Sequence, residues 1–199
     1  MSLLLETIRI EKGLPCHAAY HEHRMKYSLE KVFSVTKSFN LKKELHIPDE
    51  AFRQTYKCRI IYDEEIRQVE YVPYVKTPVK VLKIIENNRI SYPFKFADRS
   101  KLNELFSMKG KADDILIAKN GFVTDTSRAN ILFSDGEKWI TPATPLLKGT
   151  CRQRLLDEGR IFEQEIRTSD LVFFRSFVLI NAMLDFLPEN QLPVQNIIY

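Results

Sequence analysis

Two rhythms of apolar and polar residues alternate along the first half of the chain. Residues 3–10 alternate with the period of two that is typical of a strand, and apolar residues recur every three or four positions between about 15 and 39, as in an amphipathic helix. Residues 58–62, 66–75 and 79–85 return to the strand pattern and are joined by short turns. The pattern predicts one α+β unit in which the last three segments form an antiparallel meander.

The second half of the chain has the pattern of a β-rich unit with helices. Asn87-Asn88-Arg89 interrupts the apolar pattern, which predicts a boundary between a small N-terminal domain over residues 1–88 and a larger domain over residues 93–199. The elements predicted in the larger domain are helices over 99–108 and 150–158, strands over 114–118, 122–124, 161–166 and 177–181, a hairpin from 129 to 141, and an edge strand within 187–199.

Composition and charge narrow the range of possible partners. Of the 199 residues, 44% are apolar and 28% are charged, which is ordinary for a soluble globular protein. The net charge is +4, and the basic residues are interspersed with acidic ones. We therefore expect no nucleic-acid partner, whereas an anionic small molecule is compatible with this charge.

The cysteines and the first residues predict a location. Cys16, Cys58 and Cys151 are odd in number and far apart, as is typical of reduced thiols in a cytoplasmic protein. No spacing of cysteine or histidine suggests a metal site. The apolar start Met1–Leu5 is followed at once by Glu6, and no stretch has membrane-spanning length, so we expect neither a signal peptide nor a membrane span.

Candidate chemistry gathers between residues 92 and 130. Lys95 is followed, about one helix and one strand later, by Asp125 and then by Asn130. A lysine amine can bind the aldehyde of pyridoxal 5'-phosphate (PLP) covalently, and a carboxylate can keep the pyridinium nitrogen protonated so that the ring accepts electrons. The spacing alone leaves open that Lys95 is an ordinary surface lysine.

Three further positions are candidates for binding a phosphate. His21 and Arg24 share a helical face, which is either solvated or a place from which the planar Arg24 side chain reaches phosphate oxygens. Gly149-Thr150 precedes a predicted helix, whose first amides either bind an anion or are simply capped. Asn181-Ala182, at the end of a buried strand, allows the same two interpretations.

Five segments, in order, resemble those of the class IV aminotransferase family. They are His21–Met25, Phe94–Arg99, Val123–Asn130, Ile140–Pro142 with Leu147–Arg152, and Leu179–Met183. The family contains D-amino-acid and branched-chain aminotransferases and 4-amino-4-deoxychorismate lyase. The resemblance implies a two-domain α+β fold, the D-amino-acid aminotransferase-like PLP-dependent fold, with a small α+β domain and a larger β-rich domain with helices.

The resemblance also implies roles for individual residues. Lys95 would be the catalytic residue that carries PLP. The residues implied to bind the cofactor are Arg24, Lys95, Asp125, Asn130, Gly149, Thr150, Cys151, Asn181 and Ala182. Arg59 and Met183 are candidates for contact with an anionic, amino-acid-like substrate, although an exposed strand position is the simpler interpretation of Arg59. The family's assembly implies a homodimer, and no metal is implied.

The expected function is that of a PLP-dependent lyase or aminotransferase. The short chain and Asn181-Ala182-Met183 favour a lyase that forms 4-aminobenzoate and pyruvate from 4-amino-4-deoxychorismate, a reaction of folate biosynthesis. A D-amino-acid or branched-chain type aminotransferase is the alternative, and a catalytically silent PLP-binding homologue is the second alternative.

Two departures from the family pattern bear on this expectation. Asp125 stands where the family usually has the longer Glu, so the ring must lie closer to it or a water must bridge the gap. The family's earlier strand and loop are missing from the start of the chain, so the resemblance implies a reduced member.

Overall fold

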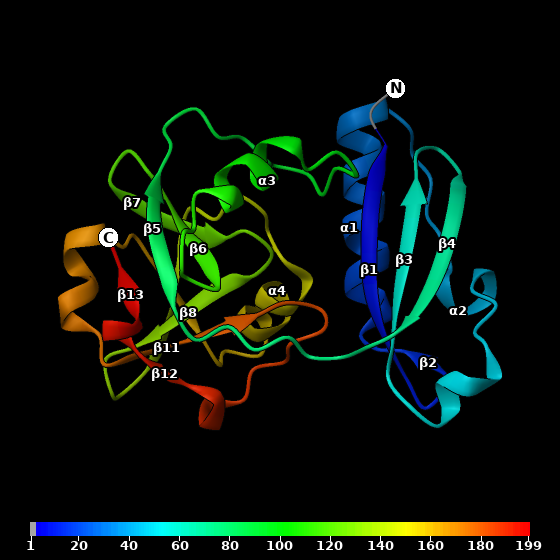
Figure 1. Ribbon diagram of the computed structural model, residues 1–199. Helices are drawn as coiled ribbons and strands as arrows, with labels where there is room; N and C mark the ends of the chain where they lie inside the picture. The colour runs from blue at the N-terminus through cyan, green and yellow to red at the C-terminus, as the bar shows by residue number, and fades with distance from the viewer. Residues whose placement is uncertain (1–2) are drawn as a thin grey trace. The chain divides into compact units, whose positions relative to one another are not determined.

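The chain folds into two units, and the first residues form a strand of the first unit, as their pattern predicts (Figure 1). The computed structural model describes residues 3–199. The first unit runs to Lys76 and includes Phe94–Asp98, and the second comprises Thr77–Pro93 and Arg99–Tyr199. The chain therefore crosses between the units three times. It passes to the second unit at residues 76–77, returns at 93–94, and passes to the second unit again at 98–99.

The first unit is an antiparallel sheet packed against a helix. Its strands, in the order β2-β1-β3-β4, are β1 (Leu4–Glu11), β2 (Leu14–Pro15), β3 (Tyr56–Tyr62) and β4 (Ile66–Pro73). Its helices are α1 (Ala18–Phe33), the short α2 (Leu41–Glu44) and the 3-10 helix η1 (Asp49–Phe52). Helix α1 ends earlier than the predicted residue 39 because Ser34 adopts a left-handed conformation that caps it.

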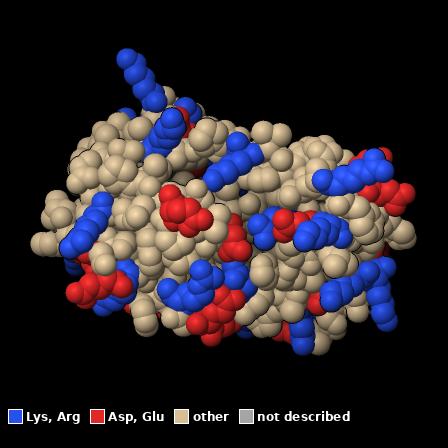
Figure 2. Space-filling view, turned by 90° about the horizontal axis from the view of Figure 1, so that it is seen from below, with Lys and Arg blue, Asp and Glu red and all other residues tan. Residues whose placement is uncertain are grey.

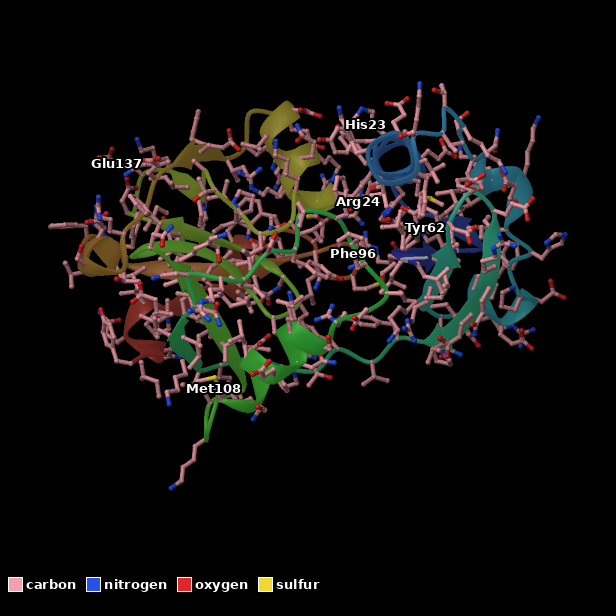
Figure 3. The ribbon with its side chains drawn as sticks, turned by 90° about the horizontal axis from the view of Figure 1, so that it is seen from above. His23, Arg24, Tyr62, Phe96, Met108 and Glu137 are labelled. Atoms are coloured by element: carbon pink, nitrogen blue, oxygen red, sulfur yellow. The ribbon has the colours of Figure 1, made fainter. Side chains whose placement is uncertain are left out.

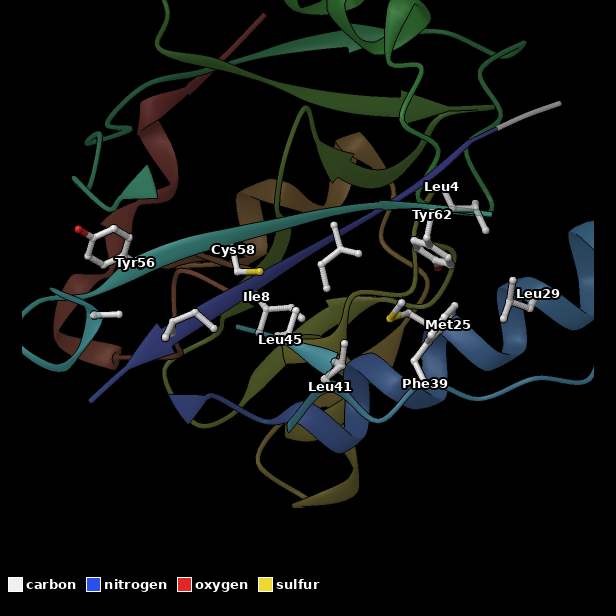
Figure 4. Packing of buried hydrophobic residues seen from close by; sticks show 13 residues of the cluster. Leu4, Ile8, Met25, Leu29, Phe39, Leu41, Leu45, Tyr56, Cys58 and Tyr62 are labelled. Carbon is white, nitrogen blue, oxygen red and sulfur yellow. The ribbon is translucent and has the colours of Figure 1, made fainter. Parts of the chain in front are cut away.

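The core of this unit follows from the period of two in β1. Leu4, Ile8 and Ile10 are fully buried on one face of the strand and pack with Met25 and Leu29 of α1 (Figure 4). These two α1 residues are four apart and therefore lie on one side of the helix. Matching the two apolar faces buries the helix on the sheet.

The segment Phe94–Asp98 runs antiparallel to the beginning of β1. The amide of Leu5 donates to the carbonyl of Lys95 at 2.7 Å, and the amide of Ala97 donates to the carbonyl of Leu3 at 2.9 Å. Phe94 and Phe96 pack against the core of the unit. Lys95 stands between these two aromatic residues, in a tight turn in which the amide of Phe96 donates to the carbonyl of Phe94 at 2.9 Å.

The second unit contains two sheets. One has the order β13-β5-β6-β7, with β5 (Leu82–Glu86), β6 (Asp114–Lys119), β7 (Phe122–Thr126) and β13 (Ile197–Ile198). The other has the order β10-β9-β8-β11-β12, with β8 (Asn130–Ser134), β9 (Trp139–Pro142), β10 (Phe162–Gln164), β11 (Ser176–Ile180) and β12 (Leu192–Pro193). The helices are α3 (Ser100–Ser107), α4 (Thr150–Asp157) and the 3-10 helices η2 (Thr168–Phe173), η3 (Pro188–Asn190) and η4 (Val194–Asn196).

The expected meander is wrong in its third strand. Strand β5 does not continue the first sheet but pairs in parallel with β6 on one side and β13 on the other. Its Leu82 is fully buried with Leu116 and Ile197 of those neighbours. The carboxylate of Asp113 accepts the amides of Lys80 and Val81 and so fixes the entry into β5. Pairing with segments far along the chain leaves no trace in the local pattern.

Candidate active site

A buried polar network joins β7, β8 and the loop before α4. The side-chain amide of Asn130 donates to Asp125 Oδ1 at 2.7 Å and to the carbonyl of Leu147 at 2.9 Å. The backbone amide of Leu147 donates to Asp125 Oδ2 at 2.9 Å. Asp125 and Asn130 are both nearly inaccessible to solvent. The network therefore brings together the predicted carboxylate and asparagine and fixes both with the 147 loop.

The separation of five residues between Asp125 and Asn130 is produced by a tight turn. The amide of Thr126 donates to the carbonyl of Ala129 at 2.9 Å, and the Ala129 amide donates to the Thr126 hydroxyl at 3.0 Å. The turn reverses the chain between β7 and β8, so that the side chains before and after it meet. A short hydroxyl residue at position 126 is what closes this turn locally.

The side chain of Asn130 lies so close to residue 149 that only glycine fits there without a shift. An ideal Cβ placed on Gly149 would lie 2.0 Å from Asn130 Oδ1, much closer than any real carbon–oxygen contact. The glycine has an ordinary extended backbone, so the cause is space and not conformation. This close contact explains why the asparagine and the glycine occur together.

Helix α4 begins directly after this glycine. No side chain caps its N-terminus, and its hydrogen-bond ladder starts with the amide of Gln153 bonded to the carbonyl of Gly149. The amides of Thr150 and Cys151 therefore precede this ladder, in the first turn of the helix. Both residues are buried. This is the local geometry expected of an anion-binding helix start.

Burial changes the proton affinity of Asp125. Removal from water raises the pKa of its carboxyl from 3.8 to about 6, although the hydrogen bonds from Leu147 and Asn130 and the charge of Arg152 oppose the rise. Each carboxylate oxygen accepts one hydrogen bond and keeps a further lone pair. A cation placed beside Asp125 would stabilise the ionised form that burial disfavours.

Asn181 forms a second turn that is tied to the first. Its side-chain oxygen accepts the amides of Met183 at 2.8 Å and Leu184 at 2.9 Å, and its side-chain amide donates to the carbonyl of Arg128 at 3.2 Å. Met183 is buried, and Ala182 is half-buried between them. The end of β11 is thereby fastened to the turn between Asp125 and Asn130.

Lys95 and Arg24 belong to the first unit. Lys95 is half-buried on the segment that pairs with the beginning of β1. Arg24 leaves α1 to meet Glu6 of β1, and Figure 3 shows it on a different side of the helix from His23. Arg24 Nη2 bonds to Glu6 Oε1, Arg24 Nε lies 3.3 Å from Glu6 Oε2, and His21 Nδ1 lies 2.6 Å from Glu6 Oε1. Of the two interpretations of the His21–Arg24 face, the solvated surface is wrong, since His21 is buried and Arg24 is only 13% exposed.

Glu6 is a buried partner of Arg24 and His21 that sequence reasoning missed. Its side chain is fully buried. Burial would raise the pKa of its carboxyl, but the charge of Arg24 and the hydrogen bond with His21 outweigh burial and lower that pKa from 4.5 to about 2. The signal was present in the chain, because Glu6 occupies an inward position of the alternating strand between Leu4 and Ile8.

Arg59 lies on the surface of the first sheet. Its Nη1 is 3.0 Å from Glu70 Oε2, directly across the β3–β4 ladder, and both side chains are over 40% exposed. In this structure Arg59 is thus paired with Glu70, and its contact with a substrate stays a prediction.

Three observations concern the surface charge, metal ligands and membrane-spanning helices. On the face seen in Figure 2, lysine and arginine side chains alternate with acidic ones. Within residues 3–199, no three His, Cys, Asp or Glu side chains are grouped so that they could hold a metal ion. In the same range, no helix combines the length and the apolar character needed to cross a bilayer.

The chemistry of these residues fits PLP. Asp125 is a buried carboxylate suited to a protonated ring nitrogen, and α4 begins with amides that no side chain caps. In the described chain, no hydrogen bond uses Arg24 Nη1, so one edge of that guanidinium has donors to offer. Lys95 supplies the primary amine that an aldehyde requires.

Comparisons with known proteins agree with this chemistry. The family model of amino-transferase class IV matches residues 94–192. A protein of Haemophilus influenzae that has no characterised function is 40% identical over 182 residues, which are 90% of this chain and 97% of the relative. The solved structure of a proposed 4-amino-4-deoxychorismate lyase from Haemophilus somnus is 34% identical, with a TM-score of 0.84, and the match covers 94% of this chain and 98% of that one.

More distant structures share the fold. A proposed amino-acid aminotransferase from Mesorhizobium loti is 19% identical with a TM-score of 0.73, and the match covers 97% of this chain and 98% of that one. These findings confirm the predicted fold class and the predicted enzyme class. The chain belongs to the class IV aminotransferase family, whose members are PLP-dependent enzymes of this α+β fold.

Proposed function

We propose that this protein is a PLP-dependent lyase that converts 4-amino-4-deoxychorismate into 4-aminobenzoate and pyruvate, a reaction of folate biosynthesis. The observation that carries the proposal is the similarity over nearly the whole chain, at 34% identity, to the Haemophilus somnus protein named for that reaction. A segment of 67 residues is also 37% identical to a proposed aminodeoxychorismate lyase of Schizosaccharomyces pombe, which covers 32% of this chain and 29% of that protein.

Each residue proposed to hold the cofactor has its own part in the proposal. Lys95 would bind its aldehyde, and Asp125, positioned by Asn130, would pair with the ring nitrogen. Arg24 and the amides of Thr150 and Cys151 would take the phosphate, and Gly149 leaves room for Asn130. Asn181 and Ala182 would close the site beside the 125–130 turn.

When bound, PLP supplies an electron sink for a carbanion at the carbon that carries the substrate amine. The amine of Lys95 would remove the proton from that carbon. The electron pair left behind drives out the enolpyruvyl group as the ring becomes aromatic, and Lys95 would return the proton to that group, which leaves as pyruvate. The substrate and the two products together balance without an added oxidant or water.

An aminotransferase is the alternative, because the fold is shared by the proposed lyase from Haemophilus somnus and by the proposed aminotransferase from Mesorhizobium loti and does not separate the two reactions. Here Lys95 would return the proton to the cofactor and not to a leaving group. The two reactions differ in their products, since only the lyase releases pyruvate from 4-amino-4-deoxychorismate. A catalytically silent homologue would bind PLP and yield neither product.

We further propose that the protein is a homodimer and that it is located in the cytoplasm.

The first experiment is an absorbance spectrum with PLP before and after borohydride, followed by a peptide mass map. We expect a near-visible band and a reduced cofactor on Lys95. Lys95→Ala should abolish both, while Lys101→Ala, which changes an exposed lysine of α3, should leave both intact. A label on another lysine would overturn the assignment of Lys95.

The second experiment separates the reactions. The protein with PLP is given 4-amino-4-deoxychorismate or single amino acids, and pyruvate, 4-aminobenzoate and the pyridoxamine form are measured. Equal amounts of pyruvate and 4-aminobenzoate support the lyase. Conversion to the pyridoxamine form with amino acids supports the aminotransferase. A cofactor bound to Lys95 with no turnover of any of these substrates supports the silent homologue.

A further inference from the structure

We propose that Glu6 is a positioning residue that fixes Arg24 for the phosphate of the cofactor. The proposal rests on the proposed function, in which Arg24 takes that phosphate. Glu6 is fully buried in the middle of β1, and among residues 3–199 its carboxylate has hydrogen-bond contacts to Arg24 and His21 of α1. Burying a carboxylate in an apolar sheet face costs free energy unless the carboxylate is paired. We therefore look for the function of Glu6 in its two partners.

The pairing uses one edge of the guanidinium. Arg24 contacts the carboxylate through Nε and Nη2, which is the side-on arrangement of an arginine with a carboxylate. An arginine has five N–H donors in one plane, so both Nη1 donors and the second Nη2 donor point to the opposite edge. Because Glu6 fixes one edge of the Arg24 guanidinium, it also fixes the direction of the opposite edge.

His21 completes the arrangement from the same helix. It lies one helical turn before Arg24 and contacts Glu6 Oε1 at 2.6 Å. Glu6 is thus held by two α1 side chains from one direction, while Leu4 and Ile8 of β1 pack on either side of it along the strand. The carboxylate cannot swing away without leaving the core.

A flexible arginine loses rotamer entropy when it binds a phosphate, and a guanidinium that is already held by Glu6 avoids most of this loss. The consequence is specific to the phosphate. Loss of Glu6 should weaken binding of PLP but not of pyridoxal, the same aldehyde without a phosphate. A purely structural role of Glu6 would weaken the binding of both compounds alike.

The test measures the affinity of the full-length protein for PLP and for pyridoxal by the near-visible absorbance band. In Glu6→Gln we expect the ratio of the two affinities to fall about 10-fold or more, as expected for a lost charge-assisted contact. Glu30→Gln is the matched control, because Glu30 is an exposed residue of α1 whose only described ion pair is with Lys26. This control should leave the ratio unchanged.

Two further variants keep the result interpretable if Glu6→Gln does not fold. Glu6→Asp keeps the charge on a shorter stem and should restore part of the ratio. Arg24→Lys sets the full loss, and Glu6→Asp combined with Arg24→Lys should lose no more than Arg24→Lys alone, because Glu6 acts through Arg24. Thermal melting of each apo variant reports its folding separately.

The outcomes separate the inference from the proposed function. If Arg24→Lys lowers the ratio but Glu6→Gln and Glu6→Asp do not, the inference about Glu6 is overturned and the proposed function stands. If wild type binds PLP no better than pyridoxal, Arg24 does not take the phosphate and the inference about Glu6 is overturned, whereas the release of pyruvate and 4-aminobenzoate still decides the proposed function. Loss of binding of both aldehydes in a folded Glu6 variant would assign Glu6 a structural role only.

Discussion

At the scale of single residues, two buried carboxylates of this protein have opposite electrostatics. Glu6 has two donors from α1, one of them a guanidinium, and its pKa falls to about 2. Asp125 has only neutral donors in direct contact, and burial raises its pKa to about 6. The difference follows from the partners and not from the burial, which both residues share. A cation in direct contact would therefore lower the pKa of Asp125, as Arg24 lowers that of Glu6.

The raised pKa of Asp125 predicts a pH dependence of stability. Because the folded pKa exceeds the unfolded value of 3.8, the folded state takes up a proton as the pH falls through about 6. Wild type without cofactor should therefore gain about 2 kcal/mol of unfolding free energy over Asp125→Asn between about pH 7.5 and pH 4.5. Urea titrations of both proteins measure it, and the fixed cost of the misplaced Asn amide cancels in the comparison.

Saturation with PLP provides the control for this prediction. A protonated ring nitrogen beside Asp125 would lower its pKa again, so the gain on acidification should disappear. A gain that persists with PLP bound would mean that Asp125 does not pair with the ring.

At the scale of elements, the beginning of α4 depends on a neighbour from another strand. Asn130, at the start of β8, approaches Gly149 so closely that no side chain fits there. In return, Asn130 holds the loop before α4 through the carbonyl of Leu147. The strand, the loop and the helix are therefore coupled, so that a shift of one of them displaces the other two.

This coupling predicts a non-additive pair of substitutions. Gly149→Ala should lower the unfolding free energy by about 1–3 kcal/mol, because the new methyl group displaces Asn130 from Asp125. In an Asn130→Ala background the same change should cost less than about 1 kcal/mol, mainly the loss of a good N-cap. Fluorescence of Trp139, the single tryptophan, follows urea unfolding of this unit. Equal costs in both backgrounds would contradict the steric explanation.

At the scale of the whole molecule, each unit is built from segments far apart in the chain. The first unit recruits Phe94–Asp98 to the edge of β1, and the second joins β5 to β13 near the C-terminus. In the first case the recruited segment carries Lys95. The position of the catalytic candidate is therefore set by pairing with the first strand of the chain.

The parallel pairing of β13 predicts an asymmetric effect of two adjacent substitutions. Ile197 is buried in the core of the second unit, whereas Ile198 is 43% exposed. Ile197→Ala should lower the unfolding free energy by about 2–3 kcal/mol, and Ile198→Ala by less than about 1 kcal/mol. Urea titrations followed by Trp139 fluorescence measure both. Similar costs would mean that β13 does not contribute to the core.

Local patterns in the sequence determined most of the elements and identified the candidate site residues. Apolar periodicity depends on the period of the element alone, so β1, α1, α4 and the 130–142 hairpin could be predicted from the residues. The motifs around Lys95 and Asp125 identified the family because they occur in order along the chain, and the comparisons confirmed the family.

Only the tertiary structure decided which distant groups meet. The partner of β5 and the contact between Asn130 and Gly149 depend on pairings over many residues, which leave no local periodicity. Glu6 was visible as an acid on an apolar strand face, but its meaning depended on Arg24 and His21 of a separate element. Free energies of burial and charge are set by such neighbours in space, and a one-dimensional pattern does not contain them.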